Sequence, residues 1–155
     1  MDDEQTLKLD ALQRDVIIAQ IDAFLAAVAD PAARAPYQAM RTAVANLEVP
    51  PEMTERLGAL AEMALNSGRV RASFGPGAAL ALWSLYQRTP RGRAIADSLA
   101  ALNGALKSLA GQPIEIVTAI ARAPGAYALT IKTAQCQMVI AFEAAGVRVE
   151  SLEVG

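Results

Sequence analysis

The stretch from Gly75 to Arg93 constrains the fold more than any other part of this sequence. Residues 78–86 read AALALWSLY, which is apolar on every face of a helix except at Ser84. A helix that is apolar all round has to be covered by other elements. The segment between the flanking Gly-Pro-Gly and Thr-Pro has about 11 residues, whereas a membrane-spanning helix needs about 20. The sequence therefore predicts a buried central helix over about 78–88, with other helices packed around it.

Apolar residues recur every three or four positions through most of the first 110 residues, which is typical of amphipathic helices. The helices expected on either side of the central one are 3–29, 36–48, 51–66 and 90–110. Residues 69–74 fit either a short strand or a loop. The first helix would be about 40 Å long, which equals the diameter of a compact domain of this size, roughly 40 Å. We therefore expect its first turns either to fray or to project onto a partner chain.

The apolar period changes to two after Pro113, which is typical of β-strands. Alternating segments occur at about 114–121, 129–133, 136–142 and 147–150, and the alternation slips at Ser151-Leu152, which suggests a bulge. Short turns join them, so we expect an antiparallel meander whose core face includes Ile114, Ile116 and Ile120. The outer face would then expose a small apolar patch, and such patches mark interfaces. The residues expected in that patch are Val117, Ala119, Val139 and Ala141.

The composition fits one α+β domain over residues 1–155, with a five-helix bundle over about 3–111 and a four-stranded β part over about 113–154. Hydrophobic residues make up 54% of the 155 residues and charged residues 19%, which is enough for a packed core. The acidic N-terminus does not resemble a signal peptide, and no run of 18 apolar residues predicts a membrane span. A single cysteine, Cys136, is compatible with a reducing compartment. We expect a cytoplasmic protein with no membrane segment.

The sequence contains no histidine, which removes the commonest general base and the commonest metal ligand. A His-containing catalytic triad is excluded, and one cysteine cannot supply the cluster that a structural zinc site needs. Cys136 shares strand parity with apolar residues, so we expect it to be buried. The chain is expected to have no enzymatic activity, no metal and no cofactor.

The charges are unevenly distributed along the chain. Residues 1–30 have a net charge of −5, and residues 67–111 have a net charge of +5. The positive segment contains five arginines, which are the candidate anion-binding or nucleic-acid-binding residues. These are Arg69, Arg71, Arg88, Arg91 and Arg93. The alternative is that they pair with acids of the first helix, such as Asp10, Asp15 and Asp22, within the chain or across a dimer.

The leading functional hypothesis is a non-enzymatic protein-interaction or scaffolding domain. We expect it to self-associate, as a homodimer, through the long acidic first helix, the outer sheet face or both. The alternative hypothesis is a nucleic-acid or anion-binding module that uses the central arginine cluster. A central helix of about 11 residues would separate the two groups of arginines by roughly 16 Å, so the five need not form one surface.

Overall fold

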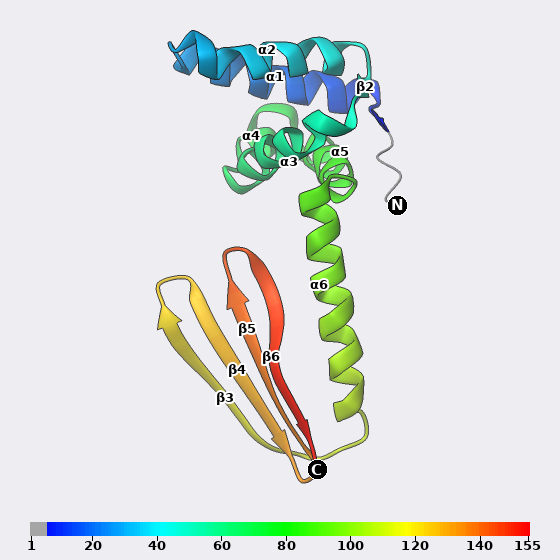
Figure 1. Cartoon of the computed structure of the whole chain (residues 1–155), viewed down its shortest axis with the longest axis vertical. Coiled ribbons are helices and arrows are strands. Elements are labelled where there is room, and N and C mark those ends of the chain that lie inside the picture. The colour runs from blue at the N-terminus through cyan, green and yellow to red at the C-terminus, as the bar shows by residue number, and fades with distance from the viewer. Residues whose placement is uncertain (1–5) are drawn as a thin grey trace. The chain divides into compact units, whose positions relative to one another are not determined.

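The computed structural model describes residues 6–155 and has an α+β fold. Within these residues, six α-helices accompany a four-stranded antiparallel sheet that packs against helical residues (Figure 1). The chain divides into two compact units, Met1–Arg93 and Ala94–Gly155. The single domain expected over 1–155 stays a prediction. Residues 3–5, where the helix expected over 3–29 would begin, lie outside the described residues.

The first unit contains five complete helices and a two-stranded pairing near its start. The short strand β1 (Leu7–Lys8) pairs antiparallel with β2 (Glu48–Val49), with Leu7 opposite Val49. Leu7 and Val49 are both buried. This ladder therefore ties the start of the chain to the connection before the third helix. The helices are α1 (Ala11–Ala27), α2 (Pro31–Ala45), α3 (Pro51–Asn66), α4 (Arg69–Phe74) and α5 (Pro76–Gln87).

The prediction of a first helix beginning near residue 3 is wrong, because a reciprocal cap starts α1 at Ala11. The Gln13 backbone N–H donates to the Asp10 carboxylate at 2.8 Å, and the Asp10 backbone N–H donates to Gln13 Oε1 at 3.1 Å. This capping box satisfies two backbone donors that a helix start otherwise leaves without partners. With 17 residues, α1 is about 25 Å long. Helix α1 is therefore too short to support the expectation that its first turns fray or project onto a partner chain.

Two other segments also differ from the sequence prediction. Helix α2 begins at Pro31 rather than Pro36 and keeps Pro36 inside it. The carboxylate of Asp30 caps it by accepting from the Ala32 N–H at 3.2 Å, and this favourable start offsets part of the cost of an interior proline. Residues 69–74, expected as a strand or loop, form the short helix α4. The predicted range of α3, 51–66, is confirmed.

Helix α5 is buried on one side only, so the prediction of a central helix covered all round is wrong. Leu82 and Leu85 are fully buried and Tyr86 nearly so, whereas Leu80 is 69% exposed and Trp83 is 42% exposed. Helices α1, α3 and α4 contact α5, and these contacts cover its buried side. The apolar residues on the opposite side of α5 remain at the surface of this unit.

The second unit consists of most of α6 (Pro90–Leu106), a 3-10 turn η1 (Lys107–Leu109) and the sheet. The four strands pair in chain order as an antiparallel meander, as the sequence predicts. Met138 and Ile140 pack with Leu102, and partly buried Leu106 and Leu109 complete this contact between helix and sheet. The strands are β3 (Ile114–Ala123), β4 (Ala126–Thr133), β5 (Cys136–Glu143) and β6 (Gly146–Val154).

The expected assignment of β3 to the core is wrong. Every residue of β3 is exposed, including Ile114, Ile116 and Ile120 at 57%, 49% and 53%. Figure 1 shows β3 at the edge of the sheet away from α6 within this unit. A strand at that edge extends beyond the cover that one helix provides. The register also places Ile116 and Ile120 opposite Lys132 and Ala128, on the face of the sheet turned away from α6, so these side chains stay in contact with solvent.

The strand register also separates the four residues of the expected outer patch. Val117 lies opposite Ile131 and therefore shares the helix-packed face, while Val139 lies opposite Thr130 on the other face. A register shift between Ile114 and Ile116 changes the alternation at the start of β3. The expected bulge in the last strand is present one residue before the predicted position, at Glu150.

None of the helices in residues 6–155 is both long enough and apolar enough to cross a membrane.

Candidate functional site: the arginine network and a basic groove

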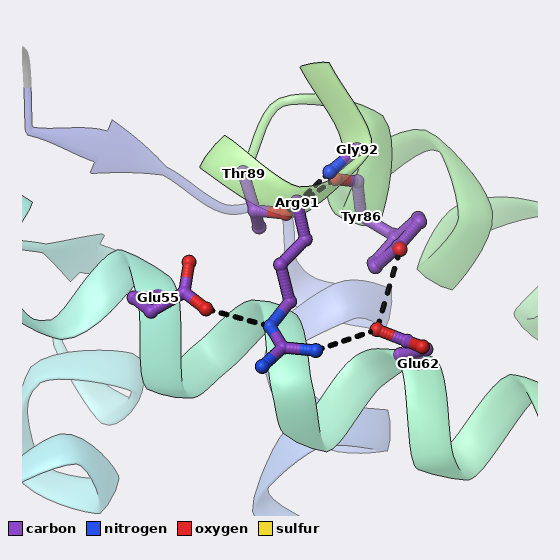
Figure 2. Close-up of polar contacts among 6 residues, drawn as sticks. All are labelled: Glu55, Glu62, Tyr86, Thr89, Arg91 and Gly92. Atoms are coloured by element: carbon purple, nitrogen blue, oxygen red, sulfur yellow. Dashed lines mark hydrogen bonds and ion pairs between the residues drawn. The ribbon is translucent and has the colours of Figure 1, made fainter. Parts of the chain in front are cut away.

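Arg91 lies in an ion-pair network that joins the start of α6 to α3 (Figure 2). Its Nε lies 2.7 Å from Glu55 Oε1, and its Nη1 lies 2.9 Å from Glu62 Oε2. The hydrogen bonds from Arg91 to Glu62 and then Glu55 raise the pKa of its guanidinium above the usual value. Two carboxylates thus neutralise Arg91, which makes it a poor partner for an external anion.

Tyr86 completes this network from the end of α5. Its hydroxyl donates to Glu62 Oε2 at 3.4 Å, as Figure 2 shows. Burial of the phenol, followed by the negative charge of Glu62, raises the pKa of Tyr86 above its usual value near 10. The phenol therefore stays protonated at neutral pH and serves as a hydrogen-bond donor.

At the junction between α5 and α6, the Thr89 side chain provides a hydrogen-bond acceptor for a backbone N–H at the start of α6. Thr89 is fully buried, and its hydroxyl donates to the Tyr86 carbonyl at 2.7 Å. The same hydroxyl accepts from the Gly92 N–H at 3.3 Å, so Thr89 caps the start of α6. The Gly92 N–H, a backbone donor that could have contacted an anion, thus already forms a hydrogen bond within the chain.

Two glycines allow the backbone to pass closely at this junction. A Cβ added at Gly92 would lie 2.1 Å from the Tyr86 carbonyl oxygen, and one at Gly58 would lie 2.9 Å from Thr89 Oγ1. Both distances are shorter than normal van der Waals contact. The network of Arg91, Glu55 and Glu62 therefore spans a closely packed junction.

Arg88 and Arg93 line a separate basic groove together with Lys8. Arg88 donates to the Lys8 carbonyl at 2.8 Å and to Gln13 Oε1 at 3.1 Å, and Arg93 donates to the Arg88 carbonyl at 3.0 Å. Thr6 also lines this open cavity of about 710 Å³. All these acceptors are neutral, and within residues 6–155 no carboxylate lies within 4.0 Å of these three cations. The two guanidinium groups are thus held in place while keeping their charge.

The remaining two arginines lie on α4, away from both groups just described. Arg69 lines a cleft between α1 and α3, and Arg71 is an exposed residue of the same short helix. The five candidate residues therefore occupy three places in the first unit. The sequence indicated that the arginines before and after the central helix could lie apart. It did not show that Arg91 separates from Arg88 and Arg93, because this depends on side-chain partners from other elements of the fold.

Within the described residues of one chain, the central arginines do not pair with acids of the first helix, and their pairing across a dimer stays a prediction. Asp10 caps α1, Asp15 pairs with Arg14 at 2.7 Å, and Asp22 pairs with Arg41 of α2 at 2.6 Å. The hydrogen bond from Arg41 lowers the pKa of Asp22. The acids that form ion pairs with Arg91 come instead from α3. Lys8 was missing from the sequence prediction because it is distant in the chain from Arg88 and Arg93.

No protein-family model, no curated protein and no solved structure matches this chain. Among the described residues, no three His, Cys, Asp or Glu side chains gather closely enough to hold a metal ion. Cys136 is buried as expected, and its Sγ lies 3.9 Å from Ser108 Oγ. Three surface features of the described residues remain as candidate binding sites. They are the exposed β3 strand, the basic groove and the cleft beside Arg69.

Proposed function

We propose that this chain is a non-enzymatic interaction domain that self-associates as a homodimer through β3. The observation that carries the proposal is that all ten residues of this edge strand are exposed. Four large aliphatic side chains on it are between 49% and 57% exposed: Ile114, Ile116, Val117 and Ile120. An edge strand also presents a row of unpaired backbone N–H and C=O groups, which can form a ladder with another strand.

The other surfaces considered from the sequence support association less well. The face of the sheet opposite α6 carries an ion-pair chain in which Arg122 of β3 reaches Glu150 of β6 at 2.6 Å. Arg148 adds contacts to Glu150 and Glu143. Ala128 and Ala141 occupy the middle of this face and are buried. The middle of this face therefore carries charged side chains, while exposed apolar residues remain on it at β3.

The charge pattern of β3 favours a second copy of the same strand as its partner. Residues 116–121 carry no charge, while Glu115 and Arg122 flank them. Antiparallel pairing about a twofold axis near Thr118 brings the Glu115 end of one strand beside the Arg122 end of the other. Such an interface is self-complementary and closed, so it stops at a dimer. The opposite edge, β6, instead carries Arg148, Glu150 and Glu153, charges that discourage edge pairing.

A charged residue on β3 is expected to dissociate the dimer. Because of the twofold symmetry, Val117→Lys or Ile116→Lys places two lysines at the interface, and we expect dimer affinity to fall by at least about 100-fold, since like-charge contacts cost several kcal/mol. Sedimentation equilibrium over micromolar concentrations measures the change. Leu80→Lys, at an exposed apolar site on α5, should leave the dimer intact. A monomeric mass for the unmodified chain throughout that range would refute the proposal.

The basic groove supports a second candidate function, the binding of anions or nucleic acid. Three positive side chains, Lys8, Arg88 and Arg93, surround one open cavity, and contacts to phosphate release counterions. We expect a single-stranded oligonucleotide to bind this groove with an affinity that falls steeply as salt rises. Removing one phosphate contact with Lys8→Gln should reduce the slope of log affinity against log salt by about 0.7.

The matched control for the groove is Arg71→Gln, which removes one positive charge from an exposed position on α4. An equal change in slope for Lys8→Gln and Arg71→Gln would show that only the net charge matters. Absence of binding to the unmodified chain at low salt would end this second candidate.

A further inference from the structure

A mostly apolar cleft lies between α1 and α3 in the first unit. Ala23, Phe24 and Ala27 of α1 form one wall, and Leu60 and Met63 of α3 contribute to the other. Its volume is about 340 Å³, within the range of small-molecule sites, about 300–1,000 Å³. The cleft exists because alanines occupy positions on both helices where larger residues would close the gap.

The cleft walls are held by contacts that do not depend on a ligand. The Phe24 ring stacks on Tyr37 of α2 with ring centroids 3.9 Å apart, which fixes its orientation. Met63 is 63% exposed, although a thioether side chain is normally favoured in an apolar environment. An aliphatic ligand in the cleft would cover surface that is otherwise in contact with water.

Arg69 is the one charged residue among the described residues that line this cleft. Its backbone N–H donates to Ser67 Oγ at 3.3 Å, while its side chain makes no hydrogen bond or ion pair with the described part of the chain. The guanidinium therefore supplies a fixed-charge donor at the margin of an apolar site. Guanidinium groups bind carboxylates through two parallel hydrogen bonds.

We propose that this cleft binds a small amphiphile, with its aliphatic chain between α1 and α3 and its carboxylate on Arg69. The lining carries one positive charge, at Arg69, beside apolar side chains of α1 and α3. This arrangement is complementary to a ligand that joins one carboxylate to one aliphatic chain. This site shares no lining residue with the basic groove and none with β3, and it adds an apolar site for an aliphatic chain.

Calorimetric titration of the full chain with decanoate and with decanol tests both parts of the proposal. We expect decanoate to bind more tightly than decanol, because only the carboxylate can pair with Arg69. Arg69→Gln should weaken decanoate binding at least about tenfold, since hydrogen bonds to charged groups are among the strong ones, and it should leave decanol unchanged. Ala23→Phe, which fills the cleft, should weaken both ligands.

Arg71→Gln is the matched control, because it removes the same charge from the same helix outside the cleft lining. Its decanoate affinity should equal that of the unmodified chain, and circular dichroism confirms that each variant keeps its helices. The proposal is overturned if decanoate does not bind, if decanol binds equally well, or if Arg71→Gln weakens decanoate as much as Arg69→Gln does.

Discussion

Replacing Gly92 with alanine is expected to lower the free energy of unfolding of the first unit by about 3 kcal/mol or more, the upper range for overpacking a rigid site. The added Cβ would lie 2.1 Å from the Tyr86 carbonyl oxygen and 2.6 Å from the Gln87 Cα. Both are backbone atoms, so no side-chain rotation can relieve the overlap. The end of α5 and the start of α6 would have to separate, which would also strain the Thr89 cap.

Urea unfolding followed by the fluorescence of Trp83, the single tryptophan, measures this change within the first unit. Gly77→Ala, in helix α5 of the same unit, is the matched control, because nothing lies within 4 Å of its added Cβ. That variant should be neutral or more stable by up to about 1 kcal/mol, since alanine is the better helix former. Equal stability of Gly92→Ala and the unmodified chain would contradict the close approach at this junction.

Replacing Leu82 with alanine is expected to lower the free energy of unfolding by about 2–5 kcal/mol, because a large buried side chain is lost and a cavity remains. Leu82 is fully buried on the covered side of α5. The same change at Leu80, two residues earlier and 69% exposed, should alter stability by no more than about 0.5 kcal/mol.

This pair of variants decides whether α5 is covered on one side or on all sides. A helix covered all round would make both substitutions costly. Chemical denaturation of the two variants under identical conditions gives the comparison, and a large cost at Leu80 would contradict the one-sided burial. Since both changes replace leucine with alanine in one helix, helix propensity cancels between them.

The fold class could be predicted because it depends on the period of apolar residues along the chain. The change of period after Pro113 marks the start of the sheet, and the turns at Pro124-Gly125 and Gly146 separate neighbouring strands. The bounds of α3 followed from Pro51 at its start and Gly68 beyond its end. These signals are local, so a single sequence contains them.

The start of α1 could have been recognised from the sequence, because Asp10 and Gln13 have the spacing of a capping box. The sequence prediction instead placed the start of this helix near residue 3. The two-residue strand β1 is too short to show any alternation. Its position depends on pairing with β2, about 40 residues later in the chain.

The sequence could not predict which residues come together at each candidate site, because the side chains that contact one another belong to different helices. Arg91 is matched by Glu55 and Glu62 of α3, whereas the sequence suggested the acids near the N-terminus. Exposure of β3 was equally hidden, since its apolar residues alternate as a buried strand would. Only the position of a strand within the sheet decides whether its apolar side chains are covered by a core.

The meander order of the sheet has a consequence for how the second unit folds. Every ladder joins strands that are neighbours in the chain, so each pairing closes a short loop and costs little chain entropy. Low contact order of this kind is associated with fast folding, and single hairpins form in about 1–10 μs. The sheet can therefore assemble one hairpin at a time, without waiting for distant segments to meet.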